Sequence, residues 1–221
     1  MIAIAIDGPA GAGKSTIARA VARELGFLYV DTGALYRAIG LYGLRQGIDT
    51  RDEAAVLALL PHIKVELRHV EGEQRVYLNG EDVSDAIRVN EASMAASNVS
   101  SIQGVRDFLF DLQRDIAQSN NVVMDGRDIG TVVLPEAQVK IFLTAAPEDR
   151  AARRQKQLES RGCQVDYQQL LAEVIERDYN DTHRAAAPLR QAEDACRIDT
   201  TGNSFQQSAQ LIIKHVKERL K

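Results

Sequence analysis

A glycine-rich stretch, Gly8–Thr16, constrains the fold more than any other feature of this sequence. The apolar run Ile2–Ile6 before it has the length of a buried strand. After it, Ile17, Val21 and Leu25 recur at the spacing of one helix face. Strand, glycine-rich turn and helix in this order fit the G-x-x-x-x-G-K-[ST] pattern in the context that it requires. The sequence therefore predicts a nucleotide-phosphate site at the start of an α/β fold.

The chemistry of this turn follows from its residue types. Its glycines let successive backbone N–H groups point at phosphate oxygens, and the following helix adds the partial positive charge of its N-terminus. Lys14 can reach the β- and γ-phosphates, and the Ser15 hydroxyl can bind Mg²⁺. The predicted ATP-binding residues of the turn are Gly8, Pro9, Ala10, Gly11, Ala12, Gly13, Lys14, Ser15 and Thr16.

A dinucleotide-binding fold is the competing interpretation of the same stretch. Asp31 ends the next strand, where an acid that binds a ribose would lie. That fold, however, requires the spacing G-x-G-x-x-G and gives a lysine no role, whereas this chain has G-x-x-G-x-G followed by Lys14. We therefore reject it.

Composition limits the partners. The chain has 221 residues, of which 45% are hydrophobic, enough for one domain with a real core and a small insertion. Its formal charge of −4 argues against a nucleic-acid or anionic-membrane surface. We find neither a signal-peptide pattern nor an apolar run of membrane-spanning length. Two cysteines without C-x-x-C spacing and four scattered histidines make structural zinc or a disulfide scaffold improbable. We expect a cytoplasmic monomer.

Hydrophobic periodicity predicts alternating strands and helices. The expected strands are 2–6, 27–30, 122–126, 139–143 and 197–200, separated by helical patterns. Such alternation predicts a parallel five-stranded sheet with helices on both faces. We expect capping boxes at 50–53 and 204–207, a further cap at 166–169, and an inward face of the last helix formed by Leu211, Ile212, His215 and Val216.

Between 63 and 87 the period changes from helical to alternating. Residues 63–70 and 75–78 alternate apolar and polar side chains, and Glu71-Gly72 and Asn79-Gly80 are typical hairpin turns. A short third piece, 81–87, completes an antiparallel meander. We interpret this unit as a small antiparallel β insertion.

Arginines indicate where a second substrate binds. Arg37 follows Thr32 by about one helical turn, and Arg127 directly follows a strand end, where ligands of α/β folds gather. Arg177, Asp181 and Arg184 have the i, i+4, i+7 spacing of one helix face. That stripe is also typical of solvated ion pairs, and the basic helix of Arg150, Arg153 and Arg154 has the same alternative. Asp125 could orient the water shell of Mg²⁺ or serve as a turn carboxylate.

Together these motifs resemble the bacterial cytidylate kinase family, in the P-loop nucleoside-monophosphate kinase group. The matching segments are 6–14, Asp31–Arg37, Asp125–Val133 and Glu176–Asp178, followed by Asp181, Arg184 and 187–189. The resemblance runs from residue 2 to about 200 and includes the antiparallel insertion. It implies a P-loop NTPase-type fold with a core (about 1–31, 88–146 and 190–221), a part that binds the nucleoside monophosphate (about 32–87) and a lid (about 147–165).

The resemblance also implies the activity and its residues. It implies transfer of the γ-phosphate of MgATP to CMP or dCMP, with Lys14, Arg127 and Arg184 catalytic. The implied CMP contacts are Thr32, Arg37, Ser97, Arg106, Arg127, Asp128, Arg177, Asp181 and Arg184. Mg²⁺ would be held by Ser15 and, through water, by Asp125. Arg150, Arg153, Arg154 and Arg161 would belong to the lid that closes over ATP, with Arg154 as its ATP contact.

Two departures from the family pattern are visible. Position 32 is Thr where we expect Ser in many members, and position 15 is Ser where some members have Gly. Two other functions are compatible with a glycine-rich turn of this kind. One is a P-loop kinase for UMP, AMP or a sugar-like acceptor. The other is a GTPase switch, which would need an Asn-Lys-x-Asp guanine motif that this chain lacks.

Overall fold

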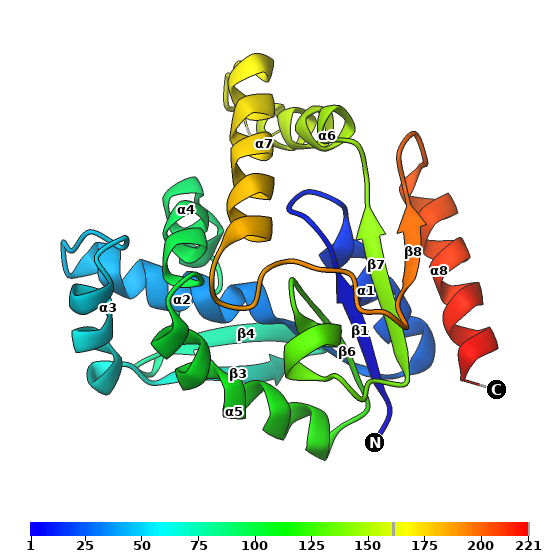
Figure 1. Ribbon diagram of the computed structural model, residues 1–221, viewed down its shortest axis with the longest axis horizontal. Helices are drawn as coiled ribbons and strands as arrows, with labels where there is room; N and C mark the ends of the chain where they lie inside the picture. The colour runs from blue at the N-terminus through cyan, green and yellow to red at the C-terminus, as the bar shows by residue number, and fades with distance from the viewer. Residues whose placement is uncertain (161, 221) are drawn as a thin grey trace. The chain divides into compact units, whose positions relative to one another are not determined.

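The computed structural model describes residues 1–160 and 162–220 (Figure 1). In this part of the chain, five strands form a parallel sheet in the order β2-β6-β1-β7-β8. Their bounds are β1 (Ala3–Asp7), β2 (Leu28–Asp31), β6 (Val122–Gly126), β7 (Val139–Thr144) and β8 (Cys196–Asp199). Every residue of β1 from Ile4 to Asp7 is buried, so both faces of the sheet are covered. The predicted parallel five-stranded sheet is confirmed.

The chain separates into two compact units, which we describe one at a time. The sheet unit comprises Met1–Tyr29 and Ala117–Lys221, and the inserted unit comprises Val30–Ile116. This division follows backbone packing, whereas the predicted core, monophosphate-binding part and lid were defined by function. That three-part division stays a prediction.

The sheet unit adds helices to the sheet. They are α1 (Lys14–Leu25), α6 (Pro147–Glu159), α7 (Tyr167–His183), α8 (Phe205–Arg219) and a π-helical turn, η3 (Ile129–Val133). Ile17 and Val21 of α1 and Ile212 of α8 pack in one core cluster with Ile6 and Ile141 of the sheet. The glycine-rich turn is thus anchored on both sides, by the central strand and by a buried helix.

The inserted unit carries the antiparallel strands. Its elements are α2 (Thr32–Arg45), α3 (Glu53–Leu59), η1 (Leu60–His62), β3 (Val65–Val70), β4 (Glu73–Leu78), β5 (Glu81–Asp82), η2 (Ala86–Arg88), α4 (Asn90–Val99) and α5 (Gln103–Ser119), which runs past its end. The strands pair in the order β3-β4-β5. Asn79 and Gly80 both have positive φ, as the predicted hairpin turn requires. The antiparallel meander is confirmed.

Helix ends and faces test the finer predictions. The expected capping box at 50–53 is wrong: Asp52 caps α3 by accepting from Ala55 N, and the Thr50 hydroxyl instead accepts from Asn98. The capping box of Ser204 and Gln207 is confirmed. Leu211 is also a correction, because it is 48% exposed while Ile212 and Val216 fill the core.

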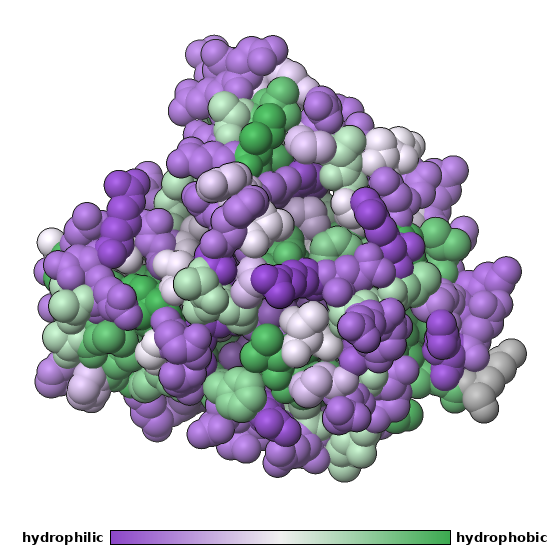
Figure 2. Space-filling model, viewed as in Figure 1, coloured by the Kyte–Doolittle hydropathy of each residue, from purple (hydrophilic) through white to green (hydrophobic). Residues whose placement is uncertain are grey.

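Surface chemistry agrees with the composition. On the face viewed in Figure 2, hydrophobic side chains are scattered among polar and charged ones. Among the described residues, no helix is both long and apolar enough to cross a membrane.

Candidate phosphate-transfer site

The glycine-rich turn lies between β1 and α1 and has the backbone that its sequence predicts. Gly8 has a φ of 149°, and a Cβ at this position would overlap the carbonyl of Leu143. Only glycine therefore fits there. Helix α1 begins at Lys14, so the first N–H groups of the helix lie next to the turn. A helix N-terminus next to a glycine-rich turn is suited to binding an anion through backbone N–H groups.

Lys14 is buried within this turn. Its Nζ donates to the carbonyl of Pro9 at 2.7 Å. Burial, and after it the nearby guanidinium of Arg127, lowers the pKa of Lys14 to about 7, against the opposing pull of Asp125 and Asp181. An anionic ligand at the turn would favour the charged ammonium.

Ser15 and Asp125 face each other, 110 residues apart in sequence. The Ser15 hydroxyl donates to Asp125 Oδ2 at 2.8 Å, and Asp125 is buried at the end of β6. A hydroxyl and a carboxylate oxygen are the hard donors that Mg²⁺ prefers. Within the described residues no group of three or more His, Cys, Asp or Glu forms a metal site. The donor set therefore fits an ion that takes most of its ligands from phosphate and water.

Arg127 begins where β6 ends and forms a buried ion pair with α7. Its Nε donates to Asp181 Oδ2 at 2.7 Å. Burial alone would raise the pKa of Asp181, but the charges of Arg127 and Arg177 outweigh it and hold the pKa below its usual value. Asp181 is 5% exposed, so the alternative of a solvated stripe is wrong at this position.

Arg184 does not lie on the helix where the spacing placed it. Helix α7 ends at His183, and Arg184 has extended backbone angles. Its Nε and Nη2 donate to the carbonyl of Ala187 at 3.0 and 2.7 Å. Its Nη2 lies 3.8 Å from Asp128 Oδ1. The structure thus brings Arg184 to the loop after β6, by way of a turn rather than a shared helix face.

Asp7 supports this loop, and sequence reasoning missed it. Its two carboxylate oxygens accept the N–H groups of Ile129 and Gly130 at 2.8 and 2.7 Å. Burial raises the pKa of Asp7 to about 6, although these two hydrogen bonds oppose the shift. The available signal was a carboxylate that ends an apolar strand, a position where a buried charge needs partners.

The arginines of the basic helix α6 differ in burial. Arg150 is 2% exposed and contacts the glycine-rich turn, so the alternative of a solvated helix face is wrong at this position, while its place in the lid stays a prediction. Arg153 donates to the carbonyl of Thr200 at 2.7 Å, and Arg154 donates to Gln157 at 3.0 Å. Arg161 lies outside the described residues. The ATP contact of Arg154 stays a prediction.

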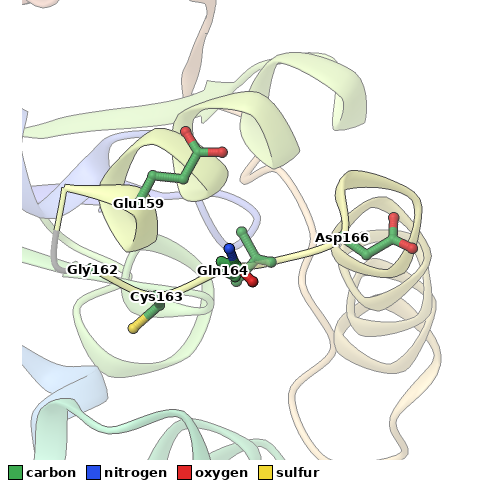
Figure 3. Close-up of a pocket in the computed structure, with 6 residues that line it drawn as sticks. Glu159, Gly162, Cys163, Gln164 and Asp166 are labelled. Carbon is green, nitrogen blue, oxygen red and sulfur yellow. The ribbon is translucent and has the colours of Figure 1, made fainter.

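A hollow of about 620 Å³ lies along the segment between α6 and α7 (Figure 3). Its lining residues are Glu159, Gly162, Cys163, Gln164, Val165 and Asp166. None of the predicted site residues is among them. We therefore build the site on the glycine-rich turn and not on this hollow.

The inserted unit holds the remaining predicted contacts, namely Thr32, Arg37, Ser97 and Arg106. Arg37 Nη2 donates to Asp31 Oδ2 at 2.7 Å, and the buried Arg37 Nε has no hydrogen-bond partner among the described residues. Arg106 is buried, donates to the carbonyl of Ser100 at 3.1 Å and lies 5.5 Å from the ring centroid of Tyr36. These four residues stay predicted contacts.

Known proteins resemble this chain in sequence and in fold. A family model described as cytidylate kinase matches residues 4–218. A cytidylate kinase from Caldicellulosiruptor bescii is 50% identical over 213 residues, 96% of this chain and 94% of that protein. One from Bacillus licheniformis is 47% identical over 219 residues, 99% of this chain and 97% of that protein. A solved structure of an uncharacterized protein from Eubacterium ventriosum is similar in fold, with a TM-score of 0.54 at 14% identity, covering 98% of this chain and 99% of that one.

Proposed function

The chain belongs to the cytidylate kinase family, whose members transfer a phosphate from ATP to CMP, and from this premise we propose how its own residues perform that transfer. The donor is MgATP, the acceptor is CMP or dCMP, and the products are ADP with CDP or dCDP. Cytoplasmic location and a monomeric state stay predictions.

One observation carries the proposal. The glycine-rich turn and Arg127 leave the sheet at neighbouring strand ends, because Asp7 of β1 pairs in register with Gly126 of β6. Ligands of parallel α/β sheets bind at this edge. The Ser15–Asp125 contact and the Arg127–Asp181 pair lie at the same edge. These neighbouring groups support a polyphosphate site with a second, cationic site beside it in the sheet unit.

Phosphoryl transfer needs positioning and compensation of negative charge. The backbone N–H groups of the turn and the Lys14 ammonium would hold the β- and γ-phosphates. Arg127 and Arg184 would neutralise the charge that develops between donor and acceptor, since guanidinium groups stay ionised and bind phosphate in a bidentate way. Ser15, with Asp125 through water, would hold Mg²⁺, which when bound supplies further charge neutralisation at the phosphates.

Separate residues would bind the base, the phosphate and the sugar of the acceptor. Arg106 and Asp128, assisted by Thr32 and Ser97, would bind the edge of cytosine, which offers two acceptors and an amino donor. Arg37 and Arg127 would bind the α-phosphate of CMP. Asp181 would accept a hydrogen bond from a sugar hydroxyl, with Arg177 and Arg184 bridging sugar and phosphate. Support comes from the orphaned Nε of Arg37, a buried donor suited to an anionic oxygen.

A lid completes the proposal. Residues 147–165 would close over ATP, with Arg154 as the contact that reaches the nucleotide. Arg154 lies in this segment, on α6, and its Nη1 donates to Gln157 of the same helix at 3.0 Å. Closure would exclude water and limit hydrolysis of ATP.

An acceptor panel tests the function. Purified protein receives ATP and Mg²⁺ with CMP, dCMP, UMP or AMP in turn, and ADP release is measured. We expect CMP and dCMP to be turned over fastest. A preference for AMP, or no turnover of CMP, contradicts the assignment. Tight GTP binding without acceptor phosphorylation would favour the GTPase switch instead.

A variant pair tests the base contact. Arg106→Met should weaken CMP binding about 30-fold, as expected when a charged hydrogen bond worth ~2 kcal/mol is lost. ATP binding should change much less. The control is Arg114→Met, which removes an exposed arginine from the same helix, α5. Equal losses of CMP and ATP affinity in Arg106→Met would refute base recognition by Arg106.

A further inference from the structure

We propose that Arg150 is a positioning residue that fixes the phosphate-binding turn against helix α7, and so holds the ATP phosphates in register with the acceptor-side charges of that helix. This inference rests on the proposed function. It gives Arg150 a role of its own, whereas the resemblance implied only that Arg150 belongs to the lid.

The contacts of Arg150 join three segments of the sheet unit. Its Nε donates to the carbonyl of Ala145, at the end of β7, at 2.9 Å. Its Nη1 donates to the carbonyl of Ala10, in the turn, at 2.9 Å, and to Asp178 Oδ1 of α7 at 2.9 Å. Its Nη2 donates to the second oxygen of Asp178. The planar fork of an arginine is suited to such a bidentate pair, and a lysine could not reproduce it.

Packing ties the turn to the same side chain. A Cβ at Gly11 would lie 3.3 Å from Arg150 Cβ, so the turn backbone rests on the aliphatic stem of Arg150. The Arg150 side chain is 2% exposed. Four of the five N–H donors of the guanidinium are engaged with protein acceptors. Arg150 therefore has little left to offer a ligand, which separates it from a residue that binds ATP directly.

Asp178 carries the connection into the acceptor side. It follows Arg177 directly in α7 and precedes Asp181 by three residues, about one helical turn. Asp181 in turn holds Arg127 at 2.7 Å. The phosphate-binding turn is thus joined through Arg150 and Asp178, one turn of the α7 backbone and then Asp181 to Arg127 at the end of β6.

Loss of this connection should affect the rate more than the binding of either nucleotide. Each half of the site keeps its own ligand contacts, but their mutual placement is no longer fixed. A misplacement of about 1 Å can cost about 100-fold in the rate of an oriented reaction. Nucleotide affinity depends on contacts within each half and should change little.

The experiment compares Arg150→Met, Asp178→Asn and the double variant with wild-type protein. We expect kcat to fall about 30-fold or more in Arg150→Met and about 10-fold in Asp178→Asn, with KM for ATP and for CMP each changing less than about 3-fold. The double variant should be no slower than Arg150→Met, because the two residues act as one unit. Lys214→Met, an exposed charge loss on helix α8 of the same unit, is the control and should keep wild-type kinetics.

Each other outcome overturns the inference. A raised KM for ATP with unchanged kcat would make Arg150 a direct ATP contact. Multiplicative losses in the double variant would show that Arg150 and Asp178 act separately. If Arg150→Met does not fold, Asp178→Asn decides, because the Asp178 side chain is 26% exposed and its replacement is milder; wild-type kcat in that variant would overturn the inference. Wild-type protein that is inactive on CMP refutes the proposed function instead.

Discussion

Charged pairs in the two units of the molecule have the same chemistry and different surroundings. In the sheet unit, Arg150–Asp178 and Arg127–Asp181 lie at the strand ends that form the proposed site, and each has at least one nearly buried partner. In the inserted unit, Arg45–Glu81, Arg68–Glu66 and Arg75–Asp82 lie on or beside the antiparallel strands, and all six side chains are between 28% and 56% exposed. Water and salt screen the second set and not the first.

The pKa values of the two units differ in the same way. In the inserted unit, hydrogen bonds from Lys64 and then Arg68 lower the pKa of Glu66 to about 2, and Ser84 does the same for Asp82. In the sheet unit, burial moves the pKa of Asp7 and of Lys14 toward neutrality. Pairing therefore dominates at Glu66 and Asp82, whereas desolvation dominates at Asp7 and Lys14. Desolvated charge is unfavourable for folding, which marks the sheet edge as the place where function has retained it.

The largest contrast in rate is expected between replacement of Lys14 in the sheet unit and of Lys64 in the inserted unit. Lys14→Ala should lower kcat/KM about 1,000-fold or more, because a cation at the transferring phosphate is lost. The fold should survive, since the variant removes a buried cation that lies near Arg127. Steady-state kinetics and a thermal melt measure both. Lys64→Ala, which removes an exposed partner of Glu66, should leave the rate unchanged. A nearly normal rate for Lys14→Ala would remove the phosphate-binding role of the turn.

Arginine replacements should separate the two regions by stability. Arg127→Met leaves the Asp181 carboxylate buried without its nearest cation, a change that costs about 3 to 5 kcal/mol when a buried pair is broken. The thermal midpoint should fall by about 6 °C or more. Arg68→Met in the inserted unit should stay within about 2 °C of wild type. Equal shifts in the two variants would erase the distinction between the regions.

The sequence pattern correctly predicted the features that depend on residues close together in the chain. The glycine-rich turn, the parallel strands and the hairpin turn at Asn79-Gly80 each follow from neighbouring residues and were confirmed. The predictions that failed concerned side chains whose partners are distant in sequence. Thr50 is no cap because Asn98 uses its hydroxyl, and Arg150 does not lie on a solvated helix face because Asp178 and the turn bind it. Periodicity shows which face of a helix is apolar but not which of several arginines finds a buried carboxylate.

Asp7 should give the sheet unit a pH dependence that the inserted unit lacks. The ordinary pKa of an aspartate is 3.8 and that of buried Asp7 is about 6. Between about pH 4 and pH 6 the folded chain keeps a proton that the unfolded chain releases, so stability falls as pH rises through this window. A shift of about two pKa units corresponds to at most about 3 kcal/mol. Urea unfolding of wild type and Asp7→Asn across this window measures the difference.

The charges around Asp7 and a control define the test. Asp128 raises the Asp7 pKa further, and Lys14 lowers it. The aliphatic part of Lys140 packs on Gly130, and the Gly130 N–H donates to Asp7. Asp82→Asn is the control, because its depressed pKa contributes stability that is lost only as pH falls from about 4 toward 2. Parallel stability curves for wild type and Asp7→Asn between pH 4 and 6 would refute the buried-carboxylate interpretation.

The smallest change in stability is expected when the pair of Arg75 and Asp82 is broken. This pair tests whether burial or distance distinguishes the charged pairs of the two units. Both side chains are about a third exposed, at 31% and 29%, although their hydrogen bond of 2.8 Å is within 0.1 Å of the 2.7 Å between Arg127 and Asp181. If distance alone set the contribution of an ion pair, the two pairs would be equivalent. Water solvates each partner once the other is gone. We therefore expect the thermal midpoint of Arg75→Met to lie within about 2 °C of that of wild type, and 1 M salt to change this small difference little. A loss as large as that of Arg127→Met would show that geometry, and not burial, distinguishes the charged pairs of this chain.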